Sequence, residues 1–332
     1  MTRKNREVVN QAVKVDKGAV DWGRFPNCRK VWLLAALTLA ASPAAAQATL
    51  DRTRFKATPV FAEEFSYVSP TDSLFRARWQ SDFYTSVNND WTEYASSEQL
   101  AILPGGILRM RTTRLSLAER QAATDSAARH GVRRPAPGPP GTLVPGGSPW
   151  GGPIAYASGK MVSRMGGSSA ELSRLGPFPG FGYGLFEIRC QLPASGRGIL
   201  PAFWLNGPQT EIDILDNCNE NPSRLLQTGV LDWGKRNACG GNAAPLECWT
   251  YGYQLYQYDR DLSQGFNTYS AVWTPEAVTF YLNDYYLYSV PAALVSTHHE
   301  AARLILDVGT RGTDHFASGE MLVDYIRVWE LR

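Results

Sequence analysis

The chain has 332 residues, of which 44% are hydrophobic and 19% are charged, with 30 glycines and 21 prolines. This composition excludes a chain that is disordered throughout, and the length suits one large β domain or two ordinary domains. The formal net charge is only +2, so nothing in the composition indicates a nucleic-acid partner.

The first segment has the pattern of an export signal. Arg29 and Lys30 precede the apolar run VWLLAALTLAA, and SPAAAQA then supplies small residues at the spacing that a signal peptidase needs. We predict a signal peptide over residues 1–46, with an unusually long n-region unless translation begins downstream of Met1, and a linker over residues 47–59. The apolar run is too short to span a membrane. The product is therefore predicted to be secreted or periplasmic, with no membrane contact after cleavage.

Removal of the signal peptide changes the charge and the cysteine count. Residues 1–46 hold 8 of the 33 basic and 3 of the 31 acidic residues, which leaves 25 basic against 28 acidic residues and a net charge near −3. Four cysteines remain in an oxidising compartment, and they favour disulfides, with three connectivities, over free thiols. Their spacing lacks the close pairs and intervening histidines of a zinc site. These cysteines are Cys190, Cys218, Cys239 and Cys248.

From about residue 60 onward, short apolar or alternating runs rich in Val, Tyr, Phe and Trp are separated by turn residues. Such runs are typical of an all-β sandwich, so we predict one domain over residues 60–332. Residues 115–153 interrupt the pattern as a long loop insertion. Its first part, LSLAERQAATDSAARHG, has helical composition, whereas residues 133–153 are too rich in Pro and Gly for regular structure.

The stretch QTEIDILDNCNE, residues 209–220, places acidic side chains on a strand. Side chains alternate between the faces of a strand, so Glu211 and Asp213 share one face and Asp216 should point away. An exposed strand can carry such residues for solubility alone. Here the preceding run GILPAFWLNG is almost entirely apolar, so we expect one face on the core and the other lining a cleft. Neighbouring carboxylates in a cleft are the working groups of a glycosidase.

The motif EIDILD resembles the signature of glycoside hydrolase family 16. Further stretches are similar to this family in order and spacing: VFAEEFS, NNDWTEYAS, YASGKMVSR, GYGLFEIRCQLPASGRGILPAFWL, FNTYSAVWTPEAVTFYLND and MLVDYIRVWE. The resemblance covers about residues 60–332. It implies a concanavalin A-like β-jelly roll, a sandwich of two curved antiparallel sheets with a substrate cleft on the concave face.

The resemblance also implies catalytic roles. Glu211 would be the nucleophile, Asp213 would assist it, and Asp216 would be the general acid/base. A β-bulge with Leu215 as the extra residue would rotate Asp216 onto the face of the other two. The family has Glu at this last position, and Asp is one methylene shorter, about 1.5 Å of reach. The chain departs from the family here.

Five further residues match positions at which the family binds substrate. Trp204 and Trp233 would stack on sugar rings, although core packing is the commoner fate of a Trp in a sandwich. Asn89 and Arg164 would hold hydroxyl groups or be ordinary surface residues. Asp232 stands in TGVLDWG where the family usually has His.

No cofactor is required for this chemistry, but many family members bind a structural Ca²⁺, for which Glu63 and Asp324 have compatible positions. The residues and the resemblance together predict a monomeric, exported, endo-acting glycoside hydrolase or transglycosylase. It would cleave internal β-linkages of a polysaccharide, a β-glucan or galactan, by a retaining double displacement. The alternatives are a lectin-like glycan-binding domain that has lost efficient catalysis, and a structural sandwich whose strand acids are incidental.

Overall fold

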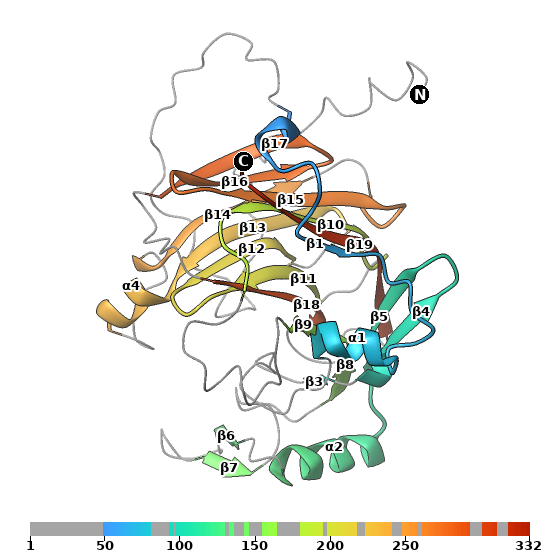
Figure 1. Cartoon of the computed structure of the whole chain (residues 1–332). Coiled ribbons are helices and arrows are strands. Elements are labelled where there is room, and N and C mark those ends of the chain that lie inside the picture. Colours follow the sequence, from blue (N-terminus) through green and yellow to red (C-terminus); the bar gives the residue numbers. More distant parts are fainter. Residues whose placement is uncertain are drawn as a thin grey trace.

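Two stacked antiparallel β-sheets form the body of the molecule in this computed structural model (Figure 1). The structure describes residues 49–80, 93–95, 97–129, 133–135, 143–145, 155–164, 180–194, 198–217, 223–240, 248–257, 261–292, 301–310 and 318–332. The predicted all-β sandwich is therefore confirmed. The predicted signal peptide, Asn89 and Cys218 lie outside the described residues.

The larger sheet has ten strands. Its main path runs in the order β17, β16, β15, β10, β19, β5, β8, β3, with β1 beside β19 and β4 beside β5. The pairs are antiparallel except β3 with β8. The strands are β1 (Phe61–Glu63), β3 (Glu93–Ala95), β4 (Leu100–Leu103), β5 (Ile107–Arg114), β8 (Tyr156–Ser158), β10 (Gly184–Gln191), β15 (Asn267–Trp273), β16 (Ala277–Leu282), β17 (Tyr285–Pro291) and β19 (Ser318–Glu330).

The smaller sheet has seven antiparallel strands in the order β14, β13, β12, β11, β18, β9, β2. Alternating apolar residues of both sheets face each other and form one core, which includes Phe186, Phe203, Ile212 and Leu306. The strands are β2 (Trp79–Gln80), β9 (Lys160–Ser163), β11 (Ile199–Asn206), β12 (Thr210–Asp216), β13 (Leu225–Asp232), β14 (Thr250–Gln257) and β18 (Arg303–Thr310).

The helices of the described residues are few and lie outside the sandwich. They are α1 (Ser73–Arg78), α2 (Leu117–Arg129), α4 (Trp233–Ala238) and the short 3-10 turns η2 (Arg52–Arg54) and η3 (Ser97–Gln99). Within the described residues, no helix is both long and apolar enough to cross a membrane.

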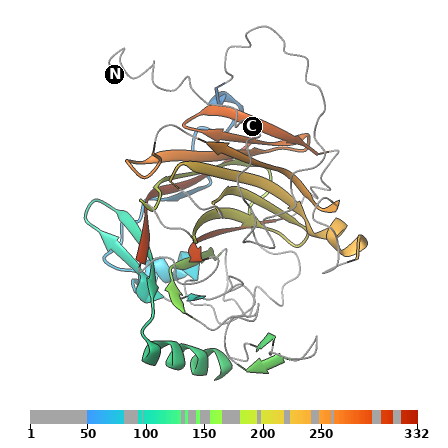
Figure 2. The same cartoon turned by 180° about the vertical axis from the view of Figure 1, so that it is seen from behind.

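Within the insertion at 115–153, α2, β6 and β7 lie apart from the two large sheets (Figure 2). Its first part forms α2, as its composition predicts. The second part corrects our expectation, because β6 (Arg133–Pro135) pairs with β7 (Leu143–Pro145) as a small two-stranded sheet. Pro135 and Pro145 stand at strand ends, where a missing N–H breaks few ladder hydrogen bonds.

Residues 49–56 are not the linker we expected, because they pack across the outer side of the ten-stranded sheet. We call this segment the N-terminal strap. Leu50 and Phe55 are buried with Leu185 of β10 in a small second core. Arg52 reaches the buried carboxylate of Glu187 at 2.5 Å.

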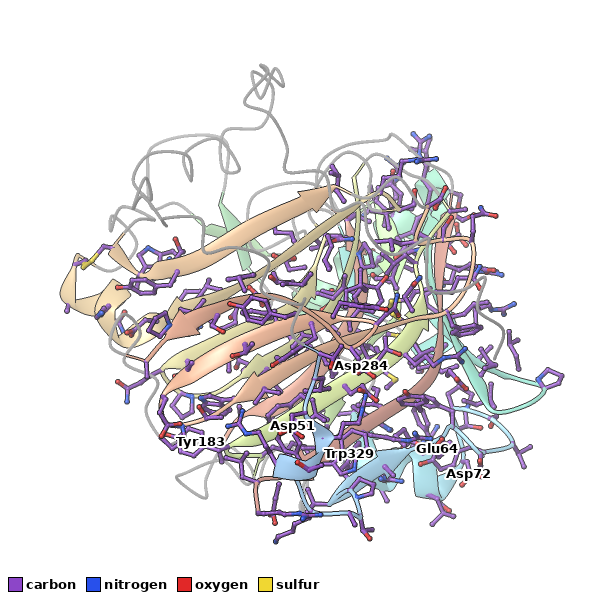
Figure 3. The ribbon with its side chains drawn as sticks, turned by 90° about the horizontal axis from the view of Figure 1, so that it is seen from above. Asp51, Glu64, Asp72, Tyr183, Asp284 and Trp329 are labelled. Atoms are coloured by element: carbon purple, nitrogen blue, oxygen red, sulfur yellow. A yellow bond between two sulfur atoms is a disulfide. The ribbon has the colours of Figure 1, made fainter. Side chains whose placement is uncertain are left out.

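The strap also pairs with residues at the end of β19 and just after it. Phe55 pairs with Leu331, and the backbone N–H of Lys56 donates to the carbonyl oxygen of Glu330 at 3.0 Å. Asp51 of the strap lies near Asp284 and Trp329 on this side of the sheet (Figure 3). The strap packs here because its apolar residues cover a sheet face that is itself apolar.

The cysteines only partly follow the predicted pairing. Cys239 and Cys248 form a disulfide. Cys190 is a free thiol in the core, which corrects the expectation that all four cysteines pair. Burial raises the pKa of the Cys190 thiol, so it stays protonated and unreactive.

Candidate active site

Three rows of side chains cross the face of the seven-stranded sheet that is turned away from the core. We call this surface the acidic face. Its residues alternate with core residues along each strand, so the pleat sends their side chains outward. Each row consists of residues that pair directly across neighbouring strands. The first row is Arg303, Asn206, Glu211 and Leu231, the second is Val162, Ile305, Trp204, Asp213 and Gly229, and the third is Lys160, Asp307, Ala202 and Asp216.

A β-bulge in β12 brings the third carboxylate onto this face. Trp204 pairs with Asp213, and the preceding residue of β11 pairs with Leu215, so Ile214 has no partner in β11. One extra residue shifts the alternation of side chains by one, which returns Asp216 to the face of Asp213. The predicted bulge is confirmed, but its extra residue is Ile214 and not Leu215. Both of these apolar side chains are buried in the core.

The carboxylate of Glu211 is held by two side-chain donors. Trp233 donates its indole N–H to Oε2 at 3.1 Å, and Asn206 donates its amide to the same oxygen at 3.4 Å. A tight Gly-Pro turn sets Asn206 directly opposite Glu211, and Gly207 donates its N–H to Thr210 at 2.8 Å. Glu211 is half-buried, and Asp213 on the same face is buried.

Trp204 lies in the middle row and is held by a buried ion pair. Its indole N–H donates to Oδ2 of Asp307 at 3.1 Å. The ammonium of Lys160 lies 3.5 Å from the same oxygen, and the side chains of both charged residues are at most 2% exposed. The Lys160 ammonium is also 5.8 Å from the centre of the Trp204 ring. Trp204 thus has a fixed orientation beside Asp213.

Asp232 is not placed to contact a substrate, which corrects our prediction for this residue. It is fully buried and is paired with Thr210, on the opposite face of the sheet from Glu211. Its carboxylate accepts the backbone N–H of Lys235 at 2.8 Å and so caps the N-terminus of α4. The first backbone N–H groups of a helix have no acceptor within the helix, and the need for one explains this placement.

Arg164 follows β9 and is half-buried at the edge of the acidic face. Its backbone N–H donates to the carbonyl oxygen of Arg78 at 2.6 Å, which continues the pairing of β9 with β2. Arg303 of β18 belongs to the row of Glu211, and burial lowers the pKa of its guanidinium. Basic side chains therefore gather on the strands away from β12.

Glu63 and Asp324, the residues named for a structural calcium, make different contacts. Glu63 is buried, and its carboxylate accepts N–H or O–H groups from Phe65, Tyr67 and Trp79 at 2.8–2.9 Å. Asp324 instead pairs with Arg189. Both carboxylates thus have partners within the protein, and the structural calcium at Glu63 and Asp324 stays a prediction. In the described ranges, no group of three or more His, Cys, Asp or Glu side chains is arranged to hold a metal.

Sequence reasoning missed Asn206, Lys160 and Asp307. The sequence offered a sign of each residue. Each is a charged or amide residue within or at the end of a largely apolar strand, and each alternates with core residues so that its side chain points to the acidic face. Asn206 is also five residues before Glu211 across a Gly-Pro turn, a spacing that favours direct pairing in a hairpin.

Comparisons with known proteins agree with this geometry. Residues 173–326 match the model of glycosyl hydrolases family 16. The endo-1,3-1,4-beta-glycanase ExsH of Rhizobium meliloti is 26% identical over 160 residues, which cover 45% of this chain and 30% of that protein. The glucan endo-1,3-beta-glucosidase of Cryptopygus antarcticus is 30% identical over 112 residues, or 31% and 37% of the two chains. The chain thus spans about a third of the length of these two relatives.

A solved structure shows the same fold. The catalytic domain of an endo-1,3-beta-glucanase (laminarinase) from Thermotoga petrophila RKU-1 superposes with a TM-score of 0.57 at 19% identity. The match covers 84% of this chain and 99% of that domain. At this identity the likeness establishes the jelly-roll architecture alone.

Proposed function

Since this chain belongs to glycosyl hydrolases family 16 through residues 173–326, we propose that it is an endo-acting glycosidase that cleaves internal β-linkages of a polysaccharide. The observation that carries the proposal is the bulge at Ile214, which sets Glu211, Asp213 and Asp216 on one face of one strand. Three carboxylates on an otherwise apolar strand have no use in packing, whereas glycoside hydrolysis needs at least two of them.

A β-1,3- or β-1,4-linked glucan is the substrate class that we favour. The names of the two relatives above, an endo-1,3-1,4-beta-glycanase and a glucan endo-1,3-beta-glucosidase, support this choice over a galactan. They also favour an enzyme over a lectin-like domain. The polysaccharide is the one partner that the proposal requires.

The reaction would proceed by two displacements. In the first, the carboxylate of Glu211 attacks the anomeric carbon while Asp216 gives its proton to the departing glycosidic oxygen, which leaves a glycosyl ester on Glu211. In the second, Asp216 takes a proton from water, the water oxygen attacks the anomeric carbon, and Glu211 departs as a carboxylate. If a sugar hydroxyl replaces this water, the result is transglycosylation.

The bound sugar would rest on Trp204. Its ring is in the row of Asp213, between the carboxylates of β12 and the basic residues of β18 and β9. Stacking of a sugar on an indole requires a ring that is already oriented, and the Asp307 contact provides this. The indole of Trp233 and the amide of Asn206 would keep the Glu211 carboxylate from rotating away.

The test is an assay for new reducing ends on laminarin, mixed-linkage glucan, agar and carrageenan. We expect turnover of at least one glucan, abolished by Glu211→Gln and unaffected by Glu276→Gln, which changes an exposed Glu in the turn between β15 and β16. Asp216→Glu should raise kcat, because the longer side chain restores reach and general acid help is worth about 10²- to 10⁴-fold. Binding of a glucan without product from wild type or from Asp216→Glu would reject hydrolysis in favour of a lectin.

A further inference from the structure

Helix α4 begins directly beside Glu211. Trp233 is its first residue, and the indole N–H of Trp233 makes the 3.1 Å contact with Oε2 of Glu211. The backbone N–H of Trp233 donates to the carbonyl oxygen of Gln209, two residues before Glu211, at 2.7 Å. The position of this indole therefore depends on how α4 is attached to β12.

The start of α4 is fixed by Asp232. Its side chain caps the helix at the N–H of Lys235. Its backbone N–H donates to the carbonyl oxygen of Trp249 at 2.7 Å, next to β14. Gly234 leaves room for this packing, since a Cβ there would lie 2.8 Å from the side chain of Gln209 and 3.3 Å from Asp232.

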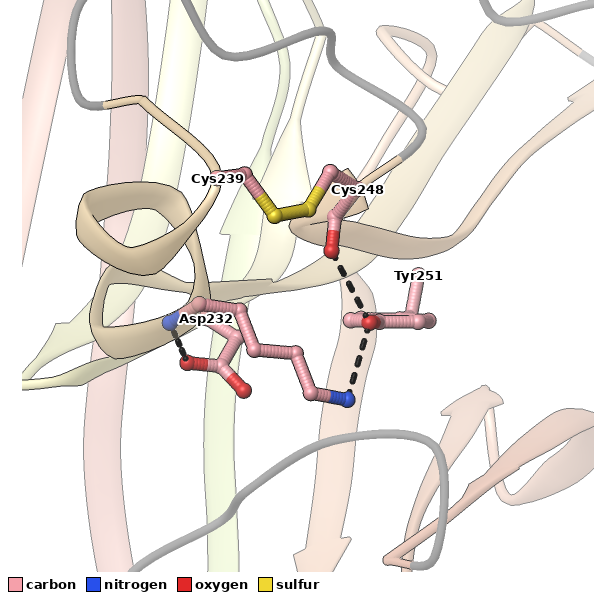
Figure 4. The surroundings of a disulfide bond; sticks show 5 residues. Asp232, Cys239, Cys248 and Tyr251 are labelled. Carbon is pink, nitrogen blue, oxygen red and sulfur yellow. Dashed lines mark hydrogen bonds between the residues drawn. A yellow bond between two sulfur atoms is a disulfide. The ribbon is translucent and has the colours of Figure 1, made fainter.

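The far end of α4 is tied to the same segment. Cys239, the residue after the helix, forms the disulfide with Cys248, which immediately precedes Trp249. Lys235 donates its ammonium to the hydroxyl of Tyr251 at 3.0 Å, and that hydroxyl donates to the carbonyl oxygen of Cys248 at 3.1 Å (Figure 4).

Trp233 and Trp249 pack against each other. We call Asp232, α4, the Cys239–Cys248 disulfide and Trp249 together the unit. The ring centres of Trp233 and Trp249 are 4.9 Å apart with an interplanar angle of 31°. The guanidinium of Arg236 lies over both rings, at 4.9 and 5.0 Å. The Trp233 ring is thus packed on one neighbour that the disulfide anchors and on another that belongs to its own helix.

We propose that Asp232, the Cys239–Cys248 disulfide and Trp249 are positioning residues that hold the indole N–H of Trp233 on the carboxylate of Glu211. The proposal rests on the proposed function only for the identity of Glu211 as nucleophile. Asp232, which stands where the family usually has His, would then act on Glu211 indirectly, through Trp233. The proposal also makes a disulfide on the far side of α4 a determinant of turnover.

The experiment follows the indole ¹H–¹⁵N resonance of Trp233 in protein labelled with ¹⁵N-Trp. Trp233→Phe assigns this resonance, and Glu211→Gln should shift it. We expect the double variant Cys239→Ser, Cys248→Ser and the single variant Asp232→Ala each to move the resonance. Each should lower kcat on the order of tenfold with KM within about twofold, as expected when a contact to the reacting group is lost. Asp232→Asn keeps an oxygen that can cap α4 and should restore both values.

The matched control is Asp72→Ala. Asp72 caps α1, a helix of the same length, by accepting the N–H of Leu74 at 2.9 Å, and it is not on the seven-stranded sheet. This variant should lose stability but keep the resonance and kcat of the wild type. If folded Asp232→Ala also keeps both, or if Asp232→Asn behaves like Asp232→Ala, the proposal is wrong. Should the cysteine variant not fold, the Asp232 pair decides alone. Should the wild type cleave no glycan, the resonance still decides whether the unit holds Trp233 on Glu211.

Discussion

At the scale of single residues, the Lys160–Asp307 pair is the least expected feature of the acidic face. Taking two charges out of water is unfavourable, and an apolar pair of similar volume would often be at least as stable. The pair is buried beside Trp204, whose indole N–H donates to the same Asp307 oxygen that Lys160 approaches. Orientation of Trp204 is the use that the contacts support.

Lys160→Met tests this pair. It leaves Asp307 buried without its cation, so we expect a loss of about 3–5 kcal/mol in the free energy of unfolding. Lys56→Met is the matched control, because the Lys56–Glu330 pair is about half exposed and should contribute about 0–1 kcal/mol. Urea unfolding of both variants makes the comparison. Equal losses would show that the buried pair has no special role in stability.

At the scale of elements, the sequence predicted strands well and their exact phase less well. Alternation marked β12, its carboxylates and the phase mismatch of Asp216, and the family resemblance implied the bulge that resolves this mismatch. Whether Ile214 or Leu215 is the extra residue could not be read from the sequence, because both are apolar and both enter the core. Asp232 was misassigned for a related reason. An Asp that caps a helix and an Asp that binds a ligand cannot be told apart in the sequence unless it is known that the following residues form a helix.

The N-terminal strap was also missed, because eight residues with two apolar side chains give no periodic signal. Arg52→Met should destabilise the protein by about 1–3 kcal/mol, since buried Glu187 would lose a charged donor and keep the hydroxyl donors Ser270 and Tyr325. Arg54→Met in the same turn is exposed and should have little effect. Urea unfolding again measures both variants, and equal stabilities would contradict a pinning role for Arg52.

At the scale of the whole molecule, two half-buried tyrosines that contact buried carboxylates of the ten-stranded sheet make the free energy of unfolding depend on alkaline pH. Burial, followed by the hydrogen bond to Glu63, raises the pKa of Tyr67 to about 12. Burial, followed by the charge of Glu187, raises the pKa of Tyr325 to about 12. An unfolded tyrosine titrates near pH 10.

As pH rises from about 10 to 12, the unfolded chain therefore releases protons that the native protein retains, and the free energy of unfolding falls. The contribution is complete below about pH 10. The double variant Tyr67→Phe, Tyr325→Phe should show a shallower fall over this range, whereas Tyr286→Phe, which changes an exposed ring, should follow the wild type. Chemical unfolding at a series of pH values measures the slopes, and identical slopes would rule out this linkage.

The strap has a consequence for the order in which the protein is completed. Thr49 pairs with Tyr285, and Phe55 pairs with Leu331, so the first described residues are bound to the last. A chain made from its N-terminus carries Phe55 without this partner until Leu331 has been synthesised. Contacts of such sequence separation form slowly because a long loop must close first. We therefore expect the pairing of Phe55 with Leu331 to form late in folding, and a chain that lacks Leu331 would keep the strap through its contacts with Leu185, Glu187 and Tyr285.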